Sequence, residues 1–85
     1  MNKKSTTKDE LFLLKLYELA LAKGDPEENI DRYHIGRTIG MNPHGIDTII
    51  KHLAQANFIK KLSDNSVFLT PHGIKLVEHL KKERF

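Results

Sequence analysis

The chain has 85 residues, a formal net charge of +3 and no cysteine. This length suits one small domain, so we expect residues 1–85 to form a single domain with residues 1–6 as a flexible basic tail. The lack of cysteine excludes disulfides, thiolate metal sites and thiol nucleophiles. No apolar run reaches the roughly 20 residues needed to cross a bilayer, and the N-terminus has no apolar signal-like core. We therefore expect a cytoplasmic protein with no membrane partner.

The first helix is predicted over residues 8–22. Thr7 can cap its N-terminus, and Glu10 stands three residues later, which is the spacing of a capping box. Gly24 follows the end of this helix, and Asp25-Pro26 prevents its continuation. Its apolar residues are spread around most of the circumference, whereas a one-sided surface helix has an apolar arc of little more than about 100°. The excess indicates that the helix also packs in a dimer interface.

Two short helices joined by a tight turn are predicted near the middle of the chain. Asp31 can cap the first, over residues 32–39, and Asn42 can cap the second, over about residues 43–56. Gly36 stands where the two helices would cross, and a steep crossing tolerates little bulk. This arrangement is typical of a helix-turn-helix.

A β-hairpin and a last helix are predicted for the rest of the chain. Two β-rich segments, about residues 58–62 and 67–70, flank the turn-forming sequence Ser63-Asp64-Asn65-Ser66. Asn57 precedes the first segment, where a left-handed residue often ends a helix. Thr70 can cap the last helix, which begins directly after it.

The predicted order is helix, short strand, helix, helix, strand, strand, helix, with Ile30 in the short strand. This order resembles the winged helix-turn-helix DNA-binding domain and is most similar to the MarR-like and ArsR-like transcriptional regulators. The segments that carry the resemblance are Ile35-Gly36, Ile39-Gly40-Met41-Asn42, Ile46, Ile49-Ile50, Leu53, Asn57-Phe58-Ile59 and Leu69-Thr70-Pro71-His72-Gly73-Ile74-Lys75-Leu76. The resemblance implies a mainly helical α+β fold with a short two-stranded wing. It also implies a small homodimeric regulator that binds double-stranded DNA.

A polar stripe lies on the outer face of the helix predicted over residues 43–56, opposite its apolar side. Its spacing is what a helix in the major groove requires, and residues 32–62 carry five basic residues and one acidic residue, a net charge of +4. Lys51 can bind phosphate or guanine, and Gln55 can bind an adenine edge. By resemblance to the family, we assign DNA contacts to His44, Thr48, Lys51, His52 and Gln55 on this helix, Arg37 before it, and Lys60 and Lys61 after it.

Some features favour a different function for the same fold. Asp47 lies beside the stripe, where a carboxylate is unfavourable near phosphate unless it accepts a hydrogen bond from cytosine N4. The predicted wing turn, residues 63–66, has no Lys or Arg, and Thr48 stands where the family often has an Arg. The alternative is a protein–protein interaction module that has lost DNA binding.

The dimer interface is expected on the first and last helices. Five histidines are present, but they lack the close spacing typical of a histidine metal site. No catalytic motif is found, so we expect no metal, no cofactor and no enzymatic activity. The residues assigned to the dimer interface are Phe12, Leu14, Leu21, Leu76 and Leu80.

Overall fold

The structure is a computed structural model that describes residues 7–84. The predicted basic tail, residues 1–6, lies outside the described residues. The order of helices and strands is the predicted one. The elements are α1 (Lys8–Lys23), β1 (Ile30–Asp31), α2 (Arg32–Thr38), α3 (Pro43–Gln55), β2 (Ile59–Lys61), β3 (Ser66–Leu69) and α4 (Pro71–Arg84).

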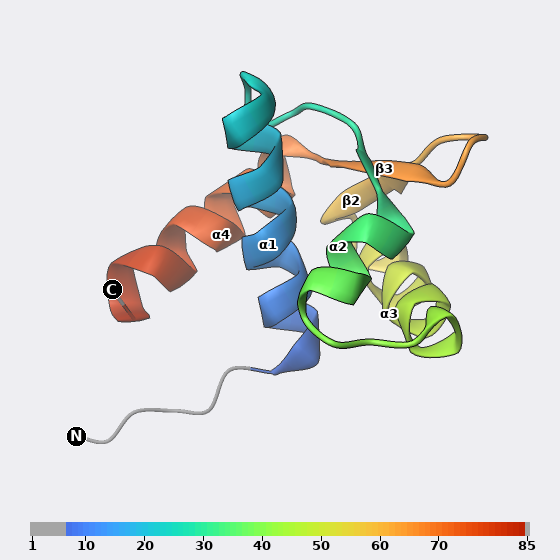
Figure 1. Ribbon diagram of the computed structural model, residues 1–85. Coiled ribbons are helices and arrows are strands. Elements are labelled where there is room, and N and C mark those ends of the chain that lie inside the picture. The colour runs from blue at the N-terminus through green and yellow to red at the C-terminus, as the bar shows by residue number, and fades with distance from the viewer. Residues whose placement is uncertain (1–6, 85) are drawn as a thin grey trace.

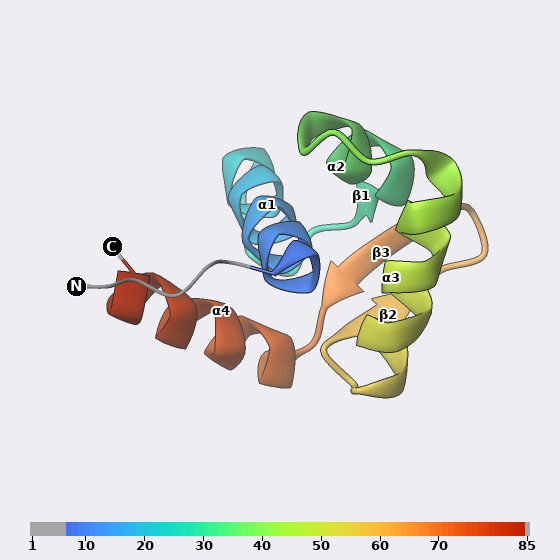
Figure 2. The same ribbon diagram turned by 90° about the horizontal axis from the view of Figure 1, so that it is seen from below.

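Helix α1 runs through the middle of the fold. It lies between α4 on one side and α2 and α3 on the other, and it also contacts β1 and β3 (Figures 1 and 2). Apolar side chains from every other helix and strand join it in one core. The buried residues of α1 are Phe12, Leu13, Leu16 and Ala20.

Two side chains assigned to a dimer interface belong instead to this core. Phe12 is fully buried and Leu80 is only 4% exposed within the single chain. The prediction is wrong for these two residues, because each lies on the side of its helix that faces the rest of the chain. Leu14 and Leu76 are partly buried and Leu21 is 47% exposed, so these three retain surface that a second copy can cover.

Side-chain caps begin all four described helices at the predicted residues. Thr7, Asp31, Asn42 and Thr70 each accept a hydrogen bond from the backbone N–H three residues later, at 2.8–3.1 Å. Each cap satisfies an N–H that has no partner within its helix. At the other end of α3, Asn57 has the predicted left-handed conformation, with φ of 66°.

The three strands form one antiparallel sheet with the order β1-β3-β2. In the wing, Ile59 of β2 lies opposite Leu69 of β3, and Lys61 lies opposite Val67. On the other edge of β3, Ile30 also pairs with Val67, so the predicted minimal strand is present. The buried side chains of this sheet face the helices and close the core.

Helices α2 and α3 form the predicted helix-turn-helix. Gly36 is buried at their crossing, and a Cβ atom there would overlap the Ile46 side chain. In the turn, Gly40 has φ of 77°, a left-handed conformation that glycine adopts at little cost. The Met41 N–H donates to the Gly36 carbonyl at 2.9 Å and closes the turn. These contacts set the angle at which α3 is presented.

Candidate nucleic-acid interface

Helix α3 presents the predicted polar stripe on its exposed side. The side chains of His44, Lys51, His52 and Gln55 are exposed, and within residues 7–84 they form no hydrogen bond or ion pair. Thr48 is also exposed, but its hydroxyl donates to the His44 carbonyl at 3.1 Å. The opposite side of the helix is anchored in the core, so the stripe is held facing outward. The anchoring residues are Ile46, Ile49, Ile50 and Leu53.

Asp47, the acidic residue beside the stripe, is bound to α2. Its Oδ1 accepts a hydrogen bond from the Tyr33 hydroxyl at 2.8 Å and lies 3.7 Å from Nη1 of Arg32. The bond to Asp47 raises the pKa of Tyr33 above its ordinary value of 10.0, because ionising the phenol would remove the donated proton. The negative charge that argued against DNA contact is therefore partly balanced by a neighbouring cation.

Arg32 joins α2 to the wing as well as to α3. Its backbone N–H and its Nε both donate to the Asn65 carbonyl, at 3.0 and 3.2 Å. The Arg32 side chain is only 15% exposed, and its Cζ lies 6.0 Å from the centroid of the Tyr33 ring. Arg32 therefore ties together the helix-turn-helix and the wing turn, where Asn65 has φ of 64°.

The two lysines assigned to the strand after α3 project from opposite faces of the wing. Both are exposed, and successive side chains of a strand alternate between its faces. Lys61 shares its face with Ile59, which is buried against the helices. Lys61 is therefore on the α3 side of the sheet, and Lys60 is on the outer side.

The wing turn, residues 63–66, contains no basic residue. Asp64 accepts a hydrogen bond from the Ser66 N–H at 3.1 Å, and this bond lowers the pKa of Asp64 below its ordinary value.

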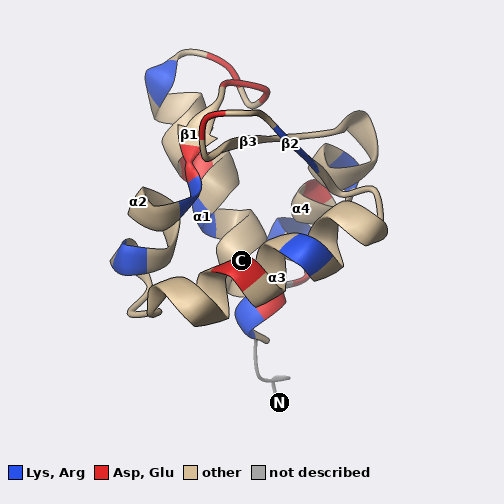
Figure 3. Ribbon diagram, turned by 90° about the vertical axis from the view of Figure 1, so that its right-hand side faces the viewer, with Lys and Arg blue, Asp and Glu red and all other residues tan. Residues whose placement is uncertain are grey.

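Arg37 is exposed in the last turn of α2. Figure 3 views this side of the molecule and shows basic segments on α2, α3 and β2 with an acidic segment in α3. The positive charge is dispersed over several elements.

Arg32, Tyr33 and Asn65 were not assigned to the site from the sequence. The Tyr33–Asp47 and Arg32–Asn65 contacts join residues that are 14 and 33 positions apart. Neither helical nor strand periodicity relates positions in different elements, so no local pattern reveals these pairs. The only hint of these contacts in the sequence was the position of Asp47 beside the polar stripe.

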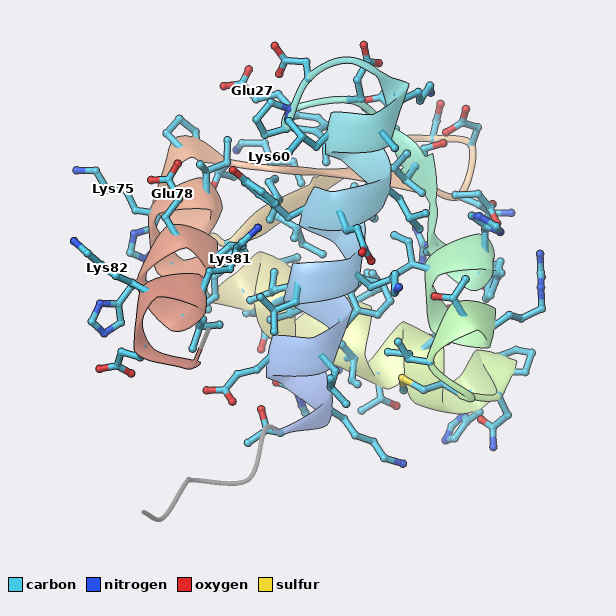
Figure 4. The ribbon with its side chains drawn as sticks, turned by 60° about the vertical axis from the view of Figure 1, so that its left-hand side comes forward. Glu27, Lys60, Lys75, Glu78, Lys81 and Lys82 are labelled. Carbon is cyan, nitrogen blue, oxygen red and sulfur yellow. The ribbon has the colours of Figure 1, made fainter. Side chains whose placement is uncertain are left out.

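A second surface feature lies on α1. An open apolar hollow of about 710 Å³ is lined mostly by α1 side chains, with Ile39 from the end of α2 and Lys81 from α4. Leu14 and Leu21, both assigned to the dimer interface, line it. Lys81 points toward α1, and its Nζ lies 5.1 Å from the centroid of the Tyr17 ring (Figure 4).

The described part of the chain contains no group of three or more His, Cys, Asp or Glu side chains that could hold a metal ion. A helix long and apolar enough to traverse a membrane is also missing from residues 7–84.

No protein-family model and no protein of curated function matches the sequence. The crystal structure of NadR in complex with 4-hydroxyphenylacetate has a similar fold, with a TM-score of 0.68 and 19% sequence identity. The similarity covers 91% of this chain and 54% of the NadR chain, so this chain spans about half the length of that one. The fold is therefore the predicted mainly helical winged helix.

Proposed function

We propose that the chain binds duplex DNA as a winged-helix transcriptional regulator, with α3 in the major groove. The exposed stripe on α3 carries this proposal. Its donors and acceptors have few partners within residues 7–84, while the opposite side of the helix is fixed in the core. Groove-reading helices need this arrangement. The similar fold of NadR, a regulator of the MarR family, supports the proposal.

The individual contacts follow from the chemistry of each side chain. Lys51 binds a phosphate or guanine, and Gln55 reads an adenine edge. The Thr48 hydroxyl is bound to its own helix, so its methyl group is left to contact a thymine methyl. We assign phosphate contacts to the remaining side chains around α3, which are Arg37, His44, His52, Lys60 and Lys61.

We also infer that two copies associate through α1 and α4, over the apolar hollow. Leu21 is 47% exposed there, and a domain of this size gains stability when such surface is covered. Leu76 of α4 is partly buried and does not line the hollow. A two-fold dimer presents two α3 helices to half-sites about 34 Å apart or a multiple of that distance.

Binding to a generic DNA duplex across a salt series tests the DNA proposal. Lys51→Ala and Lys61→Ala are each expected to weaken binding and to lower the slope of log affinity against log salt by about 0.9, the change for one lost phosphate contact. Lys60→Ala is expected to have a smaller effect, because Lys60 projects from the outer side of the wing. Lys75→Ala is the matched control, because Lys75 projects outward from α4, away from α1 (Figure 4).

Two results would contradict DNA binding: no association of the folded wild-type protein at low salt, or equal affinity for wild type, Lys51→Ala and Lys75→Ala. Either result favours the second candidate function, a protein-interaction module. The feature that favours this candidate is the wing turn, which has an acidic Asp64 and no basic residue.

A further inference from the structure

The carboxylate of Asp47 is held in one place on the exposed side of α3. The Tyr33 hydroxyl, at 2.8 Å, and the Arg32 guanidinium, at 3.7 Å, both engage its Oδ1. The Asp47 side chain is nevertheless 52% exposed, and within residues 7–84 no contact engages its Oδ2. This second oxygen is free to accept a hydrogen bond from a donor outside the chain.

Asp47 also lies close to the residues proposed to meet DNA. It stands one turn before Lys51, about 40° from it around the helix axis. A carboxylate and an ammonium at this spacing commonly pair on a helix surface. Among the described residues Lys51 has no ion pair, because Asp47 is turned toward Tyr33 and Arg32 of α2. The acid and the base on α3 therefore both remain available to a ligand.

We propose that Asp47 is a specificity-determining residue that accepts a hydrogen bond from N4 of a cytosine in the major groove. This inference rests on the proposed DNA binding. Of the four bases, cytosine offers an amino donor without the adjacent N7 acceptor that adenine places beside its own amino group. Guanine presents two acceptors and thymine an acceptor and a methyl group, so both repel or ignore a carboxylate.

The cost of placing a carboxylate near DNA strengthens this selectivity. Phosphates repel Asp47 on every sequence, and only a correctly placed cytosine compensates with a hydrogen bond. Tyr33 and Arg32 act as positioning residues, since they hold the carboxylate by Oδ1 and leave Oδ2 without a partner among the described residues. Without them the side chain is free to rotate toward Lys51 and neutralise it.

Selection from a randomised duplex library, followed by titration of single-base variants of the selected site, tests the proposal. Wild type is expected to prefer cytosine at one position. Asp47→Ala should reduce this preference about 5- to 10-fold, as expected for one lost base contact. Asp47→Asn should move the preference toward adenine at the same position, because asparagine pairs with adenine N6 and N7. Tyr33→Phe should weaken the cytosine preference although Asp47 is present.

Asp64→Asn is the matched control, since it removes an acidic charge from the wing turn and leaves α3 unchanged. It should keep the cytosine preference. If Asp47→Ala changes affinity for all duplexes by the same factor, Asp47 has only a structural or general electrostatic role and the specificity assignment is wrong, although DNA binding stands. If wild type binds no duplex at low salt, the proposed function fails and the assignment fails with it.

Discussion

Thr70 is the residue that joins the start of α4 to the end of α3. It is only 3% exposed, and its hydroxyl both accepts from the Gly73 N–H at 2.9 Å and donates to the Asn57 carbonyl at 2.7 Å. Gly73 completes the joint, because a Cβ atom there would overlap the Phe58 carbonyl. One hydroxyl therefore connects α4, which borders the apolar hollow, with the helix proposed to read DNA.

Replacing Thr70 by valine keeps the shape of the side chain and removes every hydrogen bond of the hydroxyl, including the longer one to the Phe58 carbonyl at 3.2 Å. We expect Thr70→Val to lower the free energy of unfolding by about 1–3 kcal/mol, because a buried N–H and a carbonyl lose their partner. Urea denaturation measures this change. Thr48→Val is the control, since the Thr48 hydroxyl is exposed and bonds only to its own helix. Equal losses in the free energy of unfolding would show that the hydrogen bonds of Thr70 stabilise the fold no more than the exposed hydroxyl of Thr48 does.

Tyr33 gives a spectroscopic readout of its bond to Asp47. The bond raises the pKa of Tyr33 above 10.0, so it stabilises the fold at pH values below 10.0 and this contribution is lost as the pH rises through the raised pKa. In a Tyr17→Phe background Tyr33 is the remaining one of two tyrosines, and phenolate absorbance follows its ionisation alone. Asp47→Ala should move the midpoint down toward 10.0. An unchanged midpoint would mean that the two side chains are not bonded in solution.

Helices α2 and α3 cross closely because Gly36, which has no side chain, lies directly against Ile46. A methyl group on Gly36 would meet Ile46, which is fully buried and cannot move aside easily. Gly45 is also in the helix-turn-helix, but there a methyl group would meet only the flexible end of Met41, at 3.3 Å, and Asn42 Oδ1, at 3.4 Å. Gly36 therefore has no room for a methyl group, whereas Gly45 can take one after a small movement of the Met41 side chain.

We expect Gly36→Ala to destabilise the fold by about 1–3 kcal/mol, the usual cost of overpacking a core. Gly45→Ala should be neutral or stabilising by up to about 1 kcal/mol, since alanine favours the helix. Thermal and urea unfolding compare the two variants. Adding Ile46→Ala to Gly36→Ala should cost less than the sum of the single changes, because the added methyl group then fills part of the cavity. If the two losses in the free energy of unfolding are additive, a methyl group on Gly36 does not overlap Ile46.

At the level of elements, the sequence predicts local features best. The helix boundaries agree within one residue, because caps such as Thr7 and Asn42 act on the turn that directly follows them. The outward stripe on α3 follows equally from its 3.6-residue period. The pairing of Ile30 with Val67 and the bond between Tyr33 and Asp47 were not predictable, since each depends on how distant segments pack. Phe12 was misassigned because periodicity does not tell which apolar side chains the chain covers itself.

In the molecule as a whole, α1 carries more apolar surface than one copy of the chain buries. One side of the helix fills the core, and the other lines the hollow of about 710 Å³. Both signs of charge border this hollow, with Lys15 bound to Glu18 at 2.6 Å and Lys81 on the α4 side. A two-fold interface must be complementary to itself, and a rim that carries both signs around an apolar centre meets that need.

Leu21→Glu tests whether a second copy covers the hollow. The residue is 47% exposed, so the substitution leaves the core intact while placing a carboxylate in the lining of the hollow that the proposed interface covers. Burying an unpaired charge costs several kcal/mol, so the dissociation constant of the dimer should rise by about 30-fold or more. Sedimentation at micromolar concentrations measures this change, with Ala56→Glu as a control that adds the same charge at an exposed site directly after α3. A monomeric wild type would rule out the dimer, and dimers in both variants would place the interface away from α1.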